Sequence, residues 1–114
     1  MAEEFQKIRM AVNRGPDLHF EGRLVGEYST QNKAETKDRW QELRLWETRS
    51  GAWVAEMVAR SSRHGEGDFV TADAYIPDGD YEAARSNVME TFEWSPAAKA
   101  FARTMGWDVV VRIE

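Results

Sequence analysis

The sequence predicts an α+β domain, with an antiparallel sheet of about five strands and two short helices that precede the last strand and lie on one face of the sheet. Apolar and polar residues alternate with a period of two in four segments before residue 77. Helical spacing follows between residues 80 and 106, and alternation returns from residue 107 to the end. Strands followed by helices are typical of α+β domains, and 114 residues suffice for a single domain with one modest core.

The first predicted strand extends from Leu18 to Tyr28. Its two glycines, Gly22 and Gly26, indicate a bulge or a close approach of another backbone. Residues 1–16 precede it, and their pattern is compatible with a short helix, an extra strand or a flexible end. We therefore assign residues 1–114 to one domain and leave the structure of residues 1–16 open.

Three more strands follow, and a short turn joins the first two of them. A long polar loop precedes a strand at 39–48, whose two faces are both partly apolar. The turn Arg49-Ser50-Gly51 leads into a strand at 52–60, so these two strands should form an antiparallel hairpin. The next strand, at 68–76, ends at Pro77-Asp78-Gly79.

Two helix starts are visible in the sequence. Asp80 can cap a first helix, whose apolar stripe is Tyr81, Ala84, Val88 and Phe92. Ser95 followed by Pro96 marks a second start, and Gly106 suits a left-handed C-cap. The last predicted strand, 107–114, alternates Trp107, Val109, Val111 and Ile113 with polar or smaller residues.

Composition excludes several classes of protein. The chain has no cysteine, which rules out disulfides, thiolate zinc sites and cysteine nucleophiles. A net charge of −5 argues against general nucleic-acid binding. The N-terminal residues contain no apolar run typical of a signal peptide, and no window resembles a membrane span. We expect a cytoplasmic protein.

No motif predicts catalysis, a metal or a cofactor. The segment Asp78 to Glu82 clusters three carboxylates but lacks EF-hand spacing, so a turn leading into a helix explains it better. The two histidines, His19 and His64, lie far apart in sequence, and no phosphate-binding or nucleophile-elbow motif occurs. We therefore expect no catalytic residue, no metal ligand and no cofactor.

The five tryptophans divide into three groups. Trp53 and Trp107 follow the apolar alternation and should lie in the core, whereas Trp94 should fill the junction between the helices. Trp40 and Trp46 share a strand face with charged residues. They form either an exposed aromatic platform for a partner or a core surface covered by the helices, and the covered arrangement is favoured.

Acidic residues are concentrated in the second half of the chain. Between residues 64 and 94 there are eight carboxylates and one arginine, a formal charge of −7. The simplest explanation is a solvated loop and an outward helix face. A concentrated field also favours a positively charged partner. The candidate partner-binding residues are Asp68, Asp73, Asp78, Asp80, Glu82, Glu90 and Glu93, with Trp40 and Trp46 as apolar anchors.

Three features stand out between residues 21 and 61: a strand ending in Ser29-Thr30, the opening Arg39-Trp40-Gln41-Glu42-Leu43 and the turn Thr48-Arg49-Ser50-Gly51. In these features the stretch resembles small accessory proteins of bacterial plasmids and phages. The resemblance covers about a third of the chain and consists of strand and turn residues. It implies cargo of a mobile element, a class that includes anti-CRISPR proteins, and it implies no catalytic residue.

These observations leave three hypotheses. The first is a non-enzymatic acidic protein that binds the basic surface of a host nucleic-acid-binding complex, such as a CRISPR effector, and inhibits it by mimicking nucleic acid. The second is a homodimeric structural or regulatory protein such as an antitoxin. The third is a small hydrolase that uses His64 and a carboxylate.

Overall fold

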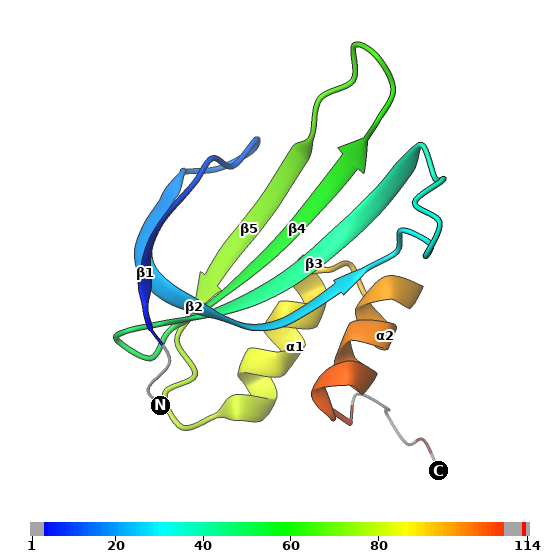
Figure 1. Cartoon of the computed structure of the whole chain (residues 1–114). Helices are drawn as coiled ribbons and strands as arrows, with labels where there is room; N and C mark the ends of the chain where they lie inside the picture. Colours follow the sequence, from blue (N-terminus) through cyan, green and yellow to red (C-terminus); the bar gives the residue numbers. More distant parts are fainter. Residues whose placement is uncertain (1–3, 109–112, 114) are drawn as a thin grey trace.

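A five-stranded antiparallel sheet and two helices make up the fold of the computed structural model, which describes residues 4–108 and 113 (Figure 1). Each strand pairs with its neighbour in sequence, in the order β1-β2-β3-β4-β5. The predicted α+β class and antiparallel sheet are thus confirmed. The elements are β1 (Gln6–Met10), β2 (Leu18–Ser29), β3 (Arg39–Thr48), β4 (Trp53–Ser61), β5 (Phe69–Tyr75), α1 (Tyr81–Thr91) and α2 (Pro96–Met105).

The strands at the two ends of the chain are not arranged as the sequence predicted. Of the three options for residues 1–16, the extra strand is the one observed, because β1 pairs with β2 from Gln6 to Met10. The fifth strand of the sheet is therefore N-terminal. Of the strand expected at 107–114, residues 109–112 and 114 lie outside the described residues, and Trp107, Asp108 and Ile113 are not in a strand.

A bulge interrupts β2, as its glycines indicated, so its alternate residues do not all share one face. The register with β3 shifts between Leu24 and Gly26. Phe20, before the bulge, packs beside Trp46, whereas Tyr28, after it, packs against the helices. The bulge places Gly26 where a Cβ would overlap the sulfur of Met105, so this glycine permits α2 to approach the sheet.

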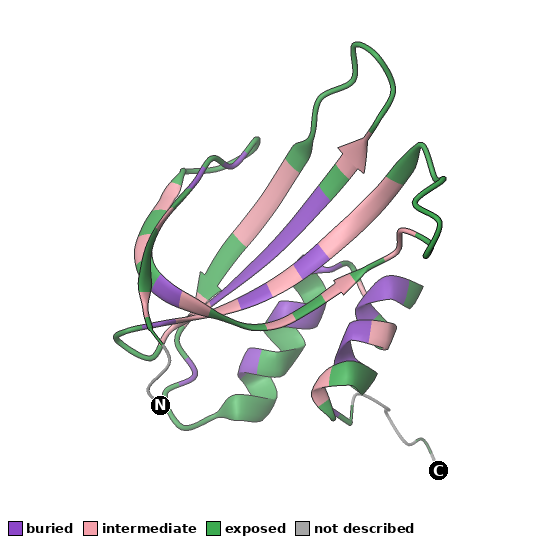
Figure 2. Cartoon of the chain, in the orientation of Figure 1, coloured by how far each residue is buried: buried purple, intermediate pink, exposed green. Residues whose placement is uncertain are grey.

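Two apolar clusters lie on opposite faces of β4, as its alternating residues require. The larger one, which we call the helix-packed core, contains Ala55 and Met57 together with buried residues of both helices, including Phe92 and Phe101 (Figure 2). The smaller one, the strand-enclosed core, contains Met10, Val12 and Val54. The central strands therefore bury side chains on both faces.

The sheet curls so that the segment after β1 reaches β5 (Figure 1). The backbone N–H of Asn13 donates to the carbonyl of Val70 at 3.0 Å, and the N–H of Val70 donates to the Asn13 side-chain oxygen at 2.6 Å. The strand-enclosed core is held inside this curl.

Both predicted helix starts are confirmed. The Asp80 carboxylate accepts from the N–H of Ala83 at 3.0 Å, and the Ser95 hydroxyl accepts from the N–H of Ala98 at 3.1 Å. Gly106 ends α2 with φ of 75°, a conformation that costs glycine little.

Replacement of Ser95 by alanine should lower the free energy of unfolding by about 1 kcal/mol, because the first turn of α2 loses its capping acceptor. Urea denaturation monitored by circular dichroism measures this change. Ser86→Ala is the matched control, because Ser86 is exposed in the middle of α1. Equal destabilisation by the two substitutions would contradict the capping role of Ser95.

Candidate functional site

Six exposed carboxylates gather on β5, on α1 and in the segments that flank α1. We call this set the β5–α1 acidic surface. No ion pair among the described residues joins any of its members to a basic group. Between residues 73 and 93, six carboxylates and one arginine give a charge of −5, which equals the charge of the whole chain. The members are Asp73, Asp78, Asp80, Glu82, Glu90 and Glu93.

The turn before α1 holds three of these carboxylates in a fixed arrangement. Asp78 and Gly79 have φ of 48° and 84°, and the N–H of Asp80 donates to the carbonyl of Pro77 at 2.8 Å. Asp80 caps the helix, and Glu82 lies in its first turn, where the helix dipole favours an anion. The local sequence therefore both builds the turn and concentrates negative charge there.

The other end of α1 carries the remaining members. The indole N–H of Trp94 donates to the Glu90 carboxylate at 2.6 Å, and Glu93 has a left-handed φ of 62° in the junction between the helices. Burial raises the pKa of the Tyr75 hydroxyl, and the charges of Asp73 and Glu90 raise it further. The structure thus brings Asp73 of β5 and Glu90 of α1 near the same hydroxyl.

The carboxylates at residues 66 and 68 lie outside this surface because arginines bind them. Arg39 of β3 donates to Glu66 at 2.5 Å, and Arg60 of β4 donates to Asp68 at 2.7 Å. The Arg39 hydrogen bond, assisted by one from Ser61, lowers the pKa of Glu66 to about 2. Asp68, a predicted partner-binding residue, is therefore already engaged within the sheet.

Trp40 and Trp46 lie on the face of the sheet opposite the helix-packed core. The expectation that the helices cover them is wrong, because the alternate residues Leu43 and Leu45 take the positions that face the helices. Trp46 packs instead in the strand-enclosed core, with its ring 6.2 Å from that of Phe20. Neither tryptophan shares a surface with α1, so the predicted site residues divide between two faces.

The two tryptophans flank a Glu–Arg network that comprises Glu42, Arg44, Glu56 and Arg60. Arg44 and Arg60 both contact Glu42, at 2.5 Å and 2.9 Å, and Arg44 lies 3.7 Å from Glu56. The indole N–H of Trp40 donates to Glu42 at 3.0 Å, and that of Trp46 donates to Glu56 at 3.1 Å.

Burial alone would raise the pKa of Glu42, but hydrogen bonds from Trp40 and Arg60 and the nearby arginine charges hold it below its ordinary value. A general acid at neutral pH needs the opposite shift. The satisfied bonds of this network therefore support a structural role.

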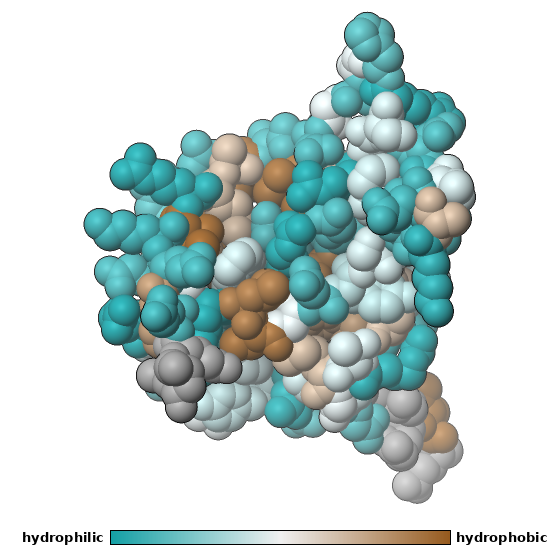
Figure 3. Space-filling view, viewed as in Figure 1, coloured by the Kyte–Doolittle hydropathy of each residue, from teal (hydrophilic) through white to brown (hydrophobic). Residues whose placement is uncertain are grey.

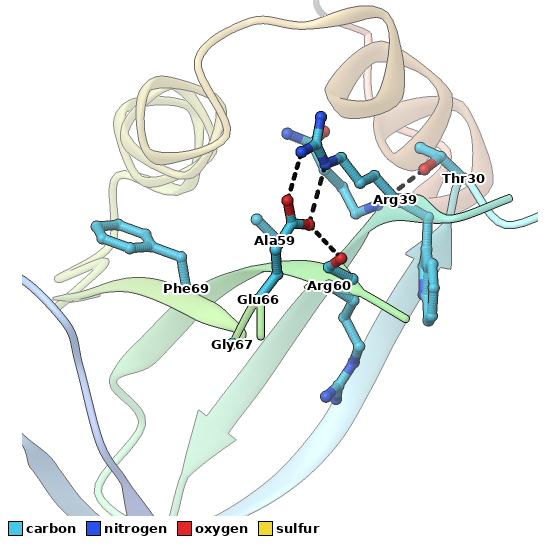
Figure 4. A pocket seen from close by; sticks show the side chains of 10 residues that line it. Thr30, Arg39, Ala59, Arg60, Glu66, Gly67 and Phe69 are labelled. Atoms are coloured by element: carbon cyan, nitrogen blue, oxygen red, sulfur yellow. Dashed lines mark hydrogen bonds and ion pairs between the residues drawn. The ribbon is translucent and has the colours of Figure 1, made fainter. Parts of the chain in front are cut away.

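A cavity of about 680 Å³ lies at the end of the sheet beside the 62–68 loop (Figure 4). The Arg39–Glu66 ion pair crosses it, and the ring of Phe69 is exposed at one side. His64 is exposed in the same loop but is absent from the residues that line the cavity. The Ser61 hydroxyl donates to Glu66, and no hydrogen bond joins a serine to His64 among the described residues.

Comparison with known protein families, curated proteins and solved structures found no match for this chain. Among residues 4–108 and 113, neither helix has the length and hydropathy needed to cross a bilayer. In the same part of the chain, no group of three or more histidines or carboxylates is placed to hold a metal ion.

The Glu66 carboxylate should make part of the stability depend on acid pH. Its folded pKa of about 2 lies below the ordinary value of 4.5, so its contribution is fully present above about pH 4.5 and is lost as pH falls towards 2. Glu66→Gln should therefore flatten the decline of the free energy of unfolding over this range, as measured by urea denaturation at successive pH values.

Glu35→Gln is the matched control for this experiment, since Glu35 is an exposed loop carboxylate that joins no ion pair among the described residues. An unchanged pH dependence in Glu66→Gln would show that the Arg39 contact contributes nothing in solution.

Proposed function

We propose that this chain is a non-enzymatic acidic protein that binds a basic protein surface of a bacterial nucleic-acid-binding complex, such as a CRISPR effector, and inhibits it by occupying the place of nucleic acid. It would act in the cytoplasm of the host as cargo of a phage or plasmid. One observation carries the proposal: the six exposed carboxylates of the β5–α1 acidic surface have no basic partner among the described residues.

The number of these carboxylates can be compared with the phosphates of a nucleic-acid strand. An α-helix of 11 residues is about 16 Å long, at a rise of about 1.5 Å per residue. One strand of duplex DNA carries a charge about every 3.4 Å along the axis, or about five charges over that length. Only Glu82 and Glu90 lie within α1, whereas Asp78, Asp80 and Glu93 lie in the segments that flank it. The surface therefore resembles a phosphate row in its number of charges and not in regular spacing.

A solvated helix face would also explain exposed carboxylates, so the proposal needs a test that separates the two explanations. A field of this kind increases the association rate with a basic surface and weakens as salt screens it, with a Debye length of about 8 Å at physiological salt. A solvated face has no partner whose binding depends on salt.

Neutralisation of four carboxylates tests the proposal. The variant Asp78→Asn, Glu82→Gln, Glu90→Gln, Glu93→Gln keeps Asp80, because loss of its cap would destabilise α1. If each exposed charge contributes about 0.5 kcal/mol, affinity should fall about 30-fold. The measurement is displacement of a labelled nucleic acid from a CRISPR effector, at low and at high salt.

The matched control changes the same number of charges elsewhere, in the variant Glu4→Gln, Glu21→Gln, Glu27→Gln, Glu35→Gln. All four positions are exposed and lie outside the β5–α1 acidic surface. Glu21 and Glu27 also pair with Arg49 and Arg44, so the melting temperature of this variant verifies that it is folded. This variant should displace nucleic acid as the parent chain does. Equal loss in both variants, or displacement that is insensitive to salt, would refute mimicry by this surface.

A second candidate function, a homodimeric regulatory protein such as an antitoxin, is favoured by one observation. β1 pairs with β2 only as far as Gly22, so the later part of β2 has β3 on one side and no strand on the other among the described residues. Leu24 and Val25 are 41% and 38% exposed there, and Figure 3 shows hydrophobic surface over the middle of β2. Light scattering distinguishes the two functions, since a monomer at micromolar concentration excludes the dimer.

We also propose the finer arrangement of the fold that the sequence suggests, with both helices on one face and a final strand at 107–114. Buried residues of both helices in the helix-packed core support the shared face. The final strand is supported only by the alternation in the sequence, since Trp107, Asp108 and Ile113 are not in a strand. Removal of residues 109–114 should then lower the melting temperature measured by calorimetry. An unchanged melting temperature would exclude the final strand.

A further inference from the structure

Two large apolar side chains protrude beside the acidic turn. Ile76, immediately after β5, is 79% exposed, and Tyr81, the first residue of α1, is 54% exposed. Single exposed apolar residues are common on protein surfaces. This pair differs in that only the turn from Pro77 to Asp80 separates the two residues, so they flank the most acidic part of the chain.

Tyr81 is held in place by an aromatic column. Its ring lies 5.8 Å from that of Trp53, which in turn stacks on Trp107 at 5.9 Å with an interplanar angle of 6°. Trp107 is only 9% exposed and belongs to the helix-packed core. The base of the column is therefore fixed while half of the Tyr81 surface remains in water.

The backbone beside Ile76 is fixed as well. Pro77 is buried, and its carbonyl accepts the N–H of Asp80 at 2.8 Å. Tyr75, on the other side of Ile76, bonds through its hydroxyl to Thr91 of α1. Side chains that are already ordered lose little entropy on binding, and rigid tyrosines are enriched among the residues that dominate binding energy.

We propose that Ile76 and Tyr81 are the apolar anchors of the partner interface, and that the partner presents an apolar pocket bordered by lysine or arginine side chains. The exposed carboxylates of Asp78, Asp80 and Glu82 each lie within two residues of Ile76 or Tyr81 in the chain, and an apolar centre with a charged rim is the usual anatomy of a protein interface. Charge complementarity identifies the occupant as a basic protein rather than an acidic one or a second copy of this acidic surface.

This inference rests on the proposed function and makes it more specific. Trp40 and Trp46, the anchors expected from the sequence, lie on the opposite face of the sheet, where their indole N–H groups bond to the Glu–Arg network. Ile76 and Tyr81 take over their role because they lie beside the carboxylates that would attract the partner.

A display library of small folded domains with randomised surfaces, selected on the immobilised full chain, provides the probe. The selected domains should carry apolar residues next to lysine or arginine. Ile76→Ser and Tyr81→Ser should each weaken binding of these domains at least about 10-fold, as loss of an interface anchor does.

Leu24→Ser is the matched control, because Leu24 is an apolar residue of 41% exposure on β2. It should leave binding unchanged. Ile76→Ser is the decisive variant, since a side chain so exposed contributes little to folding, and melting temperatures verify that each variant is folded.

The outcomes separate the inference from the proposed function. Domains that are sensitive to the four-carboxylate neutralisation but not to Ile76→Ser would overturn the anchor assignment and leave the proposed function intact. Domains that are insensitive to both changes would overturn the two together. Selected domains without basic residues would also refute the basic partner.

Discussion

The pairing of arginines with carboxylates across the sheet determines where the charge of this protein appears. Arg44 and Arg60 are bound within the Glu–Arg network, and Arg23, Arg39 and Arg49 each bind a carboxylate of a neighbouring strand or loop. The Arg23–Glu47 and Arg60–Glu42 contacts join neighbouring strands and depend on the antiparallel register, whereas Arg44 and Glu42 both belong to β3. Outside residues 73–93 the chain has equal numbers of acidic and basic side chains, and its net charge is therefore confined to β5, α1 and the segments that flank α1.

The same pairing allows β3 and β4 to bury charged side chains. Glu56 is only 8% exposed, yet its carboxylate receives the Trp46 indole N–H and lies near Arg44. A buried carboxylate without such partners would cost several kcal/mol. Since no buried side-chain polar atom among the described residues lacks a partner, the Glu–Arg network is fully hydrogen-bonded beside the strand-enclosed core.

Much of the secondary structure was predictable because its causes are local. Alternation located β2 to β5, and Asp80, Ser95 and Gly106 marked the helix ends through their own side chains or conformations. The pairing partners of residues 66 and 68 were not predictable, because Arg39 is 27 residues from Glu66 in sequence and meets it only through the hairpin register. The curl likewise depends on contacts between distant segments, whereas the β2 bulge was indicated by Gly22 and Gly26.

The β5–α1 acidic surface was predicted in part, because some of its features depend on local sequence and others on contacts between distant segments. Exposure of the carboxylates on α1 followed from helical periodicity, which is local. Trp40 and Trp46 were predicted to be covered by the helices because they are large and apolar. Since Leu43 and Leu45 take the positions that face the helices, both tryptophans lie on the opposite face of β3. The sequence indicated only that Ile76 lies at the end of an alternating strand. Its high exposure could be seen only in the folded turn.

Asn13 pairs with the outer edge of β5, which has no neighbouring strand there among the described residues. By using its backbone and its amide oxygen to satisfy Val70, it occupies the hydrogen-bonding positions at which a foreign strand would start to pair with β5. The residues before β2 thus do more than extend the sheet, because Asn13 also occupies the outward hydrogen-bonding groups of Val70 in β5. A chain without these residues would expose the backbone groups of Val70 at the edge of β5, and we expect its solubility to fall.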